Sequence, residues 1–112
     1  MPNTPCPDAG TNAGGPKAYF LIEIAVHDPE TYKQYPIGVE PLIKKYGGRY
    51  LVRGGEAQSI EGAAPGGRII VLEFPSLQAA QDFANCDEYP AVARHRHASS
   101  TSRIMLVEGY VP

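Results

Sequence analysis

The chain is poor in cysteine, in surplus basic charge and in long apolar runs. Its two cysteines, Cys6 and Cys86, lie in no CxxC spacing, which argues against a disulfide framework and against a zinc cluster. With 10 Lys and Arg against 12 Asp and Glu, the net charge is −2, so no surplus of positive charge is present to neutralise phosphates. We therefore expect neither nucleic acid nor an anionic membrane surface as a partner.

Targeting segments and common catalytic motifs are missing as well. The N-terminus lacks the basic start and apolar core of a secretory signal, and no run approaches the roughly 18 apolar residues that mark a membrane-spanning helix. The motifs GxSxG, GxGxxG, HExxH and the P-loop are absent. His95 and His97 are two positions apart, which turns them to opposite sides of a helix. We expect a soluble, cytoplasmic protein without a metal ion or another cofactor.

The chain of 112 residues is long enough for one domain and lies near the small end of the range in which one core suffices. The segment Met1–Pro16 consists mostly of Pro, Gly, Asn, Thr and Ala, and its single charge is Asp8. Such a segment cannot bury enough apolar surface to offset its ordering entropy. The sequence therefore predicts a disordered tail over 1–16 and one folded domain over 17–112.

Four segments have the composition of β-strands. Tyr19–Val26 and Arg68–Phe74 are apolar at nearly every position, as in strands at the centre of a sheet that is covered on both faces. Arg49–Arg53 and Thr101–Glu108 are the other two. The chain is thus expected to contain a four-stranded sheet.

Helical periodicity follows the first of these strands. Asp28 is a natural N-cap with Pro29 at the first helical position, and apolar side chains recur at three- and four-residue spacing as far as Gly47. Pro36 has no backbone N–H and Gly38 loosens the next turn, so a kink or break is expected between them.

A second helical region follows the third strand. Ser76 is expected to cap a helix that runs to Ala84, and Asp87 to cap a further turn in which Tyr89 and Arg96 share a face. The element order is then strand, helix, strand, strand, helix, strand. This order is typical of the α+β, ferredoxin-like βαββαβ fold, with a four-stranded antiparallel sheet and the helices on one face.

Two helical regions cover only one face of such a sheet. The other face would bear Tyr19, Leu21, Ile69 and Val71, and an apolar face of this kind needs a cover. The simplest cover is the same face of a second copy, which gives a two-fold symmetric homodimer.

Several motifs of the chain occur together in one family. They are Asp-Pro-Glu-Thr-Tyr at 28–32, Tyr-Gly-Gly-Arg-Tyr-Leu-Val-Arg-Gly-Gly at 46–55, Glu-Phe-Pro-Ser-Leu at 73–77 and Glu-Tyr at 88–89. In this combination the chain resembles the domain-of-unknown-function 1330 family, within the dimeric α/β-barrel superfamily. The resemblance spans about residues 17–110 and implies a ferredoxin-like protomer that pairs into a barrel. It implies no substrate, because the family is named for lacking one.

Two carboxylates stand on the expected central strands. Glu23 and Glu73 lie among apolar neighbours, where burial would raise the pKa of a carboxyl group toward a value suited to general acid or base catalysis. The alternative is a structural ion pair for each of them with an arginine such as Arg53, Arg68 or Arg103.

Further candidates surround the space between the sheet and its helices, where a pocket is expected. His27 follows the first strand at the edge where such a pocket would open, and a histidine there could move a proton near neutral pH. The alternative is that His27 simply packs or bonds a loop. Arg96 is suited to clamp a carboxylate, or equally to hold its helix to a strand. The sequence thus predicts His27 and Glu73 as catalytic candidates and Tyr32, Tyr35, Tyr89 and Arg96 as ligand contacts.

Two functions remain open at this point. One is a small-molecule binding protein or a cofactor-free enzyme, since the superfamily that the chain resembles includes monooxygenases and isomerases that act on organic substrates without metal or flavin. The other is a non-catalytic dimeric structural module whose polar groups only fix register and pairing. An enzyme needs an accessible cavity on the order of hundreds of Å³, whereas aromatic side chains would fill that space in a structural module.

Overall fold

The computed structural model describes residues 15–112, so all but the last two residues of the expected disordered tail, 1–16, lie outside the described residues. The elements follow in the order β1 (Ala18–Val26), α1 (Pro29–Tyr32), α2 (Gln34–Lys45), β2 (Arg49–Arg53), β3 (Arg68–Phe74), α3 (Leu77–Ala84), α4 (Tyr89–Ser99) and β4 (Ser100–Glu108). This is the predicted βαββαβ order, with each helical region divided into two pieces.

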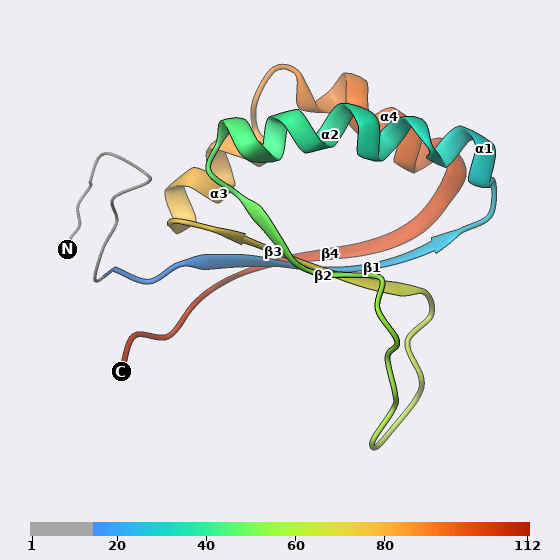
Figure 1. Cartoon of the computed structure of the whole chain (residues 1–112), viewed down its shortest axis with the longest axis horizontal. Coiled ribbons are helices and arrows are strands. Elements are labelled where there is room, and N and C mark those ends of the chain that lie inside the picture. The colour runs from blue at the N-terminus through green and yellow to red at the C-terminus, as the bar shows by residue number, and fades with distance from the viewer. Residues whose placement is uncertain (1–14) are drawn as a thin grey trace.

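The four strands form one antiparallel sheet in the order β2-β3-β1-β4. The predicted central pair, β1 and β3, is confirmed. The helices lie together on one face of the sheet, and no helix of residues 15–112 lies on the other face (Figure 1). The α+β, ferredoxin-like fold is therefore confirmed. Within residues 15–112, no helix has both the length and the apolar composition needed to cross a membrane.

The core fills the layer between the sheet and the helices. Alternate side chains of β1 and β3 point into it, and among them Phe74 is 0% and Ile24 is 2% exposed. The rings of Phe20, Phe74 and Phe83 lie with centroids 5.1 to 5.9 Å apart, a spacing typical of attractive aromatic pairs. These contacts join α3 to the two central strands.

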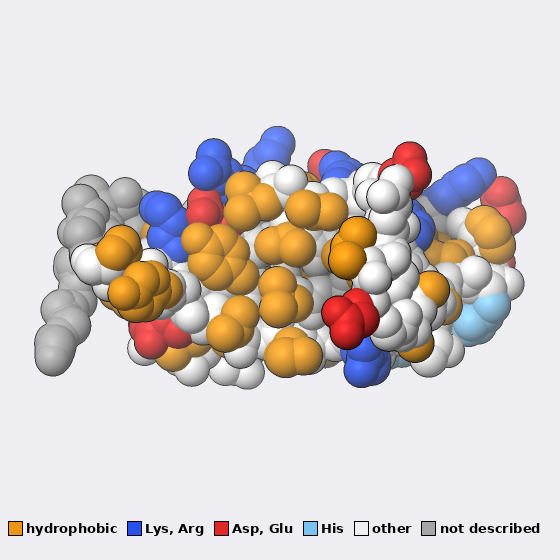
Figure 2. All heavy atoms as spheres, turned by 90° about the horizontal axis from the view of Figure 1, so that it is seen from below, with side chains coloured by type: hydrophobic (Ala, Val, Ile, Leu, Met, Phe, Trp, Pro, Cys, Tyr) orange, Lys and Arg blue, Asp and Glu red, His pale blue; other side chains and the backbone are white. Residues whose placement is uncertain are grey.

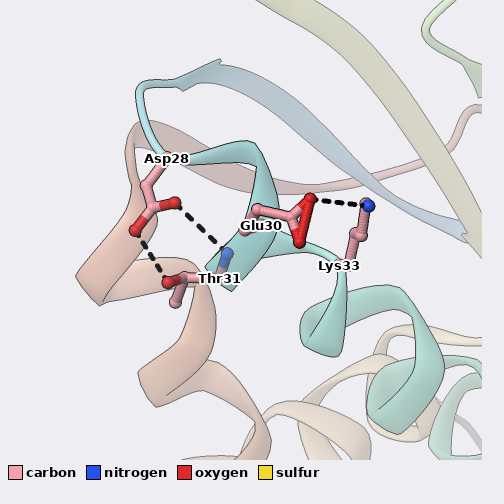
Figure 3. Close-up of polar contacts among 4 residues, drawn as sticks. All are labelled: Asp28, Glu30, Thr31 and Lys33. Carbon is pink, nitrogen blue, oxygen red and sulfur yellow. Dashed lines mark hydrogen bonds and ion pairs between the residues drawn. The ribbon is translucent and has the colours of Figure 1, made fainter.

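Asp28 begins α1 as the sequence predicts. Its carboxylate accepts hydrogen bonds from the backbone N–H of Thr31 at 3.3 Å and from the Thr31 hydroxyl at 2.7 Å (Figure 3). Glu30 and Lys33 form an exposed ion pair of 2.8 Å on the same turn. Ser76 caps α3 by accepting a hydrogen bond from a backbone N–H at 3.0 Å, so this prediction is confirmed too.

The predicted break near Pro36 to Gly38 is wrong. The helical region is interrupted at Lys33 instead, and α2 runs through both Pro36 and Pro41. Pro36 is the third residue of α2, where a backbone N–H has no partner within the helix, so its ring costs little there. A side chain at Gly38 would approach the Val92 side chain to 3.1 Å. Gly38 therefore permits close packing of α2 against α4 and does not interrupt the helix.

The predicted cap at Asp87 is also wrong. The N-cap of α4 is Glu88, and no side chain caps this helix start. Glu88 is already helical, with φ −79° and ψ −21°, whereas a side-chain cap requires an extended residue. The turn is instead closed by the backbone, because the N–H of Tyr89 donates to the carbonyl of Cys86 at 3.2 Å.

The helix-free face of the sheet, called the open face below, is apolar. It carries Tyr19, Leu21, Val52, Ile69, Val71, Met105 and Val107. Leu21 is 41% exposed and Met105 is 60% exposed, although both lie in the middle of strands. Figure 2 shows these hydrophobic side chains gathered across the sheet, with charged side chains at the edges. The predicted doubly apolar character of β1 and β3 is therefore confirmed.

The Asp28→Ala variant is expected to melt about 4 °C below the wild type at neutral pH, because it loses the cap. The hydrogen bond from the Thr31 hydroxyl is the main cause that lowers the pKa of the Asp28 carboxyl. A lowered pKa contributes stability above the ordinary value near 4, and that stability is lost as pH falls through the lowered value. Thermal unfolding from pH 7 to pH 2 should show the difference shrinking below about pH 4.

The control for this experiment is Glu30→Ala. It removes only an exposed ion pair, which contributes little in water, so its melting temperature should follow that of the wild type. A difference between Asp28→Ala and the wild type that stays constant down to pH 2 would contradict the assignment.

Candidate functional site

A cavity of about 50 Å³ opens on the helix-covered side of the sheet, between α2 and the strands β1, β2 and β3. Its lining is Ile22, Ile24, Tyr32, Tyr35, Pro36, Val39, Ile43, Tyr50, Arg53, Arg68, Ile70 and Leu72. The volume exceeds the roughly 10–15 Å³ that one water requires, and it is below the about 150 Å³ of a cavity that encloses benzene. The cavity therefore admits a small ligand only in part.

Strand alternation places Arg68 at this cavity. Arg68 lies opposite Ile24 of β1 and two residues before Ile70, so it shares the helix-covered side of the sheet with both. The same alternation turns Ile69 and Val71 to the open face. Arg68, the first residue of β3, thus places its guanidinium group at the end of the row of apolar side chains that face the helices.

A β-bulge in β2 places Arg53 beside Arg68. The pairing of β2 with β3 shifts between Tyr50 and Val52, which leaves Leu51 as the extra residue. Because a bulge reverses the alternation beyond it, Tyr50 and Arg53 both face the helices, while Val52 lies on the open face. Without the bulge, Arg53 would point away from the cavity.

The three tyrosines of the lining are neutral near pH 7. Burial is the largest cause that raises the pKa of Tyr32, Tyr35 and Tyr50. Within the described part of the chain, the hydroxyls of Tyr32 and Tyr50 have no hydrogen-bond partner, whereas Tyr35 shares one of 3.2 Å with Tyr89. Two phenols are therefore free to bond a ligand.

The two arginines of the lining differ in their partners. Arg53 forms an ion pair with Glu40 of α2, and its guanidinium carbon lies 4.4 Å from the centroid of the Tyr50 ring. Arg68 takes part in no ion pair and in no side-chain hydrogen bond among residues 15–112. Its guanidinium lies against Gly54, where an added Cβ would be 2.7 Å from Nη2.

Tyr89 and Arg96 form a partly buried network beside the cavity lining. Arg96 is 6% exposed, and it donates to the Ser102 hydroxyl at 2.6 Å and to the Tyr89 hydroxyl at 3.3 Å. Its guanidinium carbon lies 5.5 Å from the centroid of the Tyr35 ring. Arg96 therefore holds α4 to β4, which is the second of its two expected roles, with hydrogen bonds in place of an ion pair.

The two catalytic candidates do not line the cavity. Glu73 lies on the open-face side of the sheet, where its carboxylate accepts hydrogen bonds from Arg49 Nε at 2.8 Å and from the Tyr19 hydroxyl at 3.2 Å. His27 is exposed just after β1, and its backbone N–H donates to the Ser99 carbonyl at 2.9 Å. Of the predicted residues, the cavity brings together Tyr32 and Tyr35.

Glu23 forms the ion pair that was the alternative expectation. Its carboxylate accepts from Arg103 Nε at 2.9 Å and from the backbone N–H of Gly66 at 2.5 Å. The hydrogen bond from Gly66, followed by that from Arg103, lowers the pKa of Glu23. The predicted raised pKa of Glu23 is therefore wrong, because the β2–β3 loop supplies a donor that the strand pattern does not reveal.

The chemistry of the lining favours binding over proton transfer. Among residues 15–112, no Asp, Glu or His belongs to it, and its phenols remain protonated near neutral pH. Among the described residues, no three His, Cys, Asp or Glu side chains come together as a metal ion would require. What the lining offers is an apolar interior, hydrogen-bond donors and two guanidinium groups.

Sequence reasoning missed Tyr50, Arg53 and Arg68 as lining residues. The signal for Arg68 was present, because it alternates in phase with Ile70 and Leu72. For Arg53 the alternation of side chains was misleading. In a regular strand over Arg49–Arg53, both terminal arginines would lie on the same face of the sheet, whereas the bulge puts them on opposite faces.

Two of three comparisons with known proteins find relatives of this chain. A family model described as "Domain of unknown function (DUF1330)" matches residues 17–110. The crystal structure of RPA0582, a protein of unknown function from Rhodopseudomonas palustris, is similar with a TM-score of 0.72 and 18% identity, over 88% of this chain and 85% of that one. SnoaB, a cofactor-independent oxygenase from Streptomyces nogalater, is similar with a TM-score of 0.55 and 15% identity, over 82% and 91%. No curated protein matches the chain significantly, and at these identities the likeness is one of fold alone.

Proposed function

The chain belongs to the DUF1330 family, whose function is unassigned, and we propose that it binds a small organic molecule in the cavity between its sheet and helices. The observation that carries this proposal is the lining itself, in which aliphatic walls meet phenol and guanidinium groups. Sites for small molecules are mostly apolar, with a few polar groups that fix orientation. At about 50 Å³ the cavity holds one end of the ligand, and the rest lies at the mouth.

Tyr32 and Tyr50 are the proposed hydrogen-bonding contacts, because their hydroxyls have no partner among the described residues. Tyr35 contributes its ring. Tyr89 and Arg96 hold that ring in place through the network behind it and act as positioning residues. SnoaB is described as an oxygenase. Because the described lining residues include no proton acceptor, we propose only binding for this chain, and no reaction.

The proposed assembly is a homodimer through the open face. The apolar side chains of this face lie on all four strands, and a large contiguous apolar surface marks an interface. A second copy is the occupant that fits, because a two-fold axis sets the same apolar surface against itself. Two ion pairs, Arg49–Glu73 and Arg103–Glu23, border this apolar surface. The cavity lies on the other side of the sheet and stays open in such a dimer.

Filling the cavity is expected to abolish binding. Val39 is 2% exposed and lines the cavity, so Val39→Phe directs a ring into it. Ligand-observed NMR with benzoate, benzamide and benzyl alcohol should detect at least one of these probes on the wild type and none on Val39→Phe. Val39→Leu adds a single methylene and serves as the second variant, with weaker binding expected.

The matched control is Ile37→Phe, which adds a ring on the same helix at a position that is 68% exposed and outside the lining. It should bind the probes as the wild type does. Binding that survives in a folded Val39→Phe protein, or no binding of any probe to the wild type, would refute the proposal.

A further inference from the structure

The cavity has an unbalanced positive charge at its mouth. Over the described part of the chain, its lining includes two arginines and no acidic residue. Glu40 of α2 pairs with Arg53, and Arg68 has no carboxylate within ion-pair distance among residues 15–112. One guanidinium charge therefore remains without a partner.

The two guanidinium groups belong to one corner of the sheet. Arg53 ends β2 and Arg68 begins β3, and the N–H of Gly54 donates to the Ile69 carbonyl at 2.9 Å, so the two strand ends are directly paired. Both positive charges act on the phenol of Tyr32, although burial remains the larger influence on its pKa. Arg68, Arg53 and Tyr32 thus line the same cavity.

We propose that the ligand of this cavity is a small planar monoanion, a carboxylate or enolate on an apolar body, with its charged oxygens at Arg68 and Arg53. This inference rests on the proposed function and adds the chemical class of the ligand. A guanidinium group donates two parallel hydrogen bonds to a carboxylate, which is the strongest geometry for such a pair. The free hydroxyls of Tyr32 and Tyr50 offer further donors to the same oxygens.

The size and shape of the cavity restrict the apolar body of the ligand. The cavity offers only about 50 Å³, and aromatic rings of Tyr32, Tyr35 and Tyr50 line it. Flat ligands stack favourably on such rings. A single ring with one acidic group fits these limits, because the edge of the ring enters the apolar interior while the acid stays beside the arginines at the mouth.

The test compares two probes of nearly equal shape, benzoate and benzamide, by NMR titration of the full-length protein. Arg68→Gln keeps hydrogen-bond donors but removes the charge. Arg94→Gln is the control, since Arg94 is exposed on α4 and its side chain bonds only the Ala91 carbonyl. Circular dichroism and melting temperatures establish that each variant is folded.

Benzoate should bind the wild type about tenfold more tightly than benzamide, and Arg68→Gln should remove about that factor for benzoate alone. Arg94→Gln should match the wild type. Equal affinity for both probes, unchanged in Arg68→Gln, would overturn the anion inference and leave the binding function standing. Equal losses in Arg68→Gln and Arg94→Gln would show a net-charge effect and would also overturn it. Failure of both probes to bind the wild type would overturn the inference, and it would overturn the proposed function as well if benzyl alcohol also fails to bind.

Discussion

The Leu21→Asp variant is expected to be a monomer, or to aggregate, under conditions in which the wild type is a dimer. Leu21 lies opposite Val71 on one neighbouring strand and Met105 on the other, in the middle of the open face. In a two-fold dimer each partner would bury one new carboxylate against apolar side chains. Burying an unpaired charge costs several kcal/mol, which raises the dissociation constant by about a thousandfold or more.

Size-exclusion chromatography with light scattering, or native mass spectrometry, measures this directly. Ile37→Asp is the matched control, because it introduces the same charge at an exposed aliphatic position on α2, on the helix side of the sheet. It should remain dimeric. Val71→Asp, directly opposite Leu21, should behave as Leu21→Asp does. A stable dimer of Leu21→Asp, or a monomeric wild type, would contradict pairing through the open face.

The Gly67→Ala variant is expected to lose about 2–3 kcal/mol of unfolding free energy. A Cβ added at Gly67 would lie 2.2 Å from the carbonyl oxygen of Ile24 and 2.7 Å from the backbone nitrogen of Ala25. These are backbone atoms of β1, which cannot turn aside as a flexible side chain does. Relief requires the start of β3 to move away from β1, and pairing of the two central strands would weaken.

Urea unfolding followed by circular dichroism measures the loss. The control is Gly55→Ala in the same loop, where nothing lies within 4 Å of the added atom. Its unfolding free energy should stay within about 0.5 kcal/mol of that of the wild type. Because Gly67 precedes Arg68, benzoate binding should also weaken in Gly67→Ala. Equal stability of the two alanine variants would show that the close approach of the backbones is not a constraint.

Local signals in the sequence predicted elements well where short-range physics decides them. The Asp28 and Ser76 caps depend on a side chain and a backbone N–H three residues apart, so a sequence contains all the information needed. The failures at Pro36 and Asp87 have a common reason. The helical region is interrupted at Lys33, and a backbone hydrogen bond closes the turn before Tyr89. In both places the backbone adopts an arrangement that no capping side chain signals.

The site was less accessible to sequence reasoning than the fold. Tyr32 and Tyr35 could be placed at the cavity because the helical period turns them toward the sheet. Glu73 looked like a candidate base, since apolar neighbours along a strand suggest burial. A strand has two faces, however, and Glu73 lies on the one where Arg49 and Tyr19 bond it.

The sequence alone determined the ferredoxin-like order of elements, the central position of β1 and β3, and an apolar face left without helices, because period-two and helical patterns are local. Only the tertiary structure decided the composition of the cavity. The bulge at Leu51 turns Arg53 to the helix side, and strand pairing sets Arg68 beside it. Both depend on register between segments that are distant in sequence, where one residue of slip exchanges the two faces of a strand.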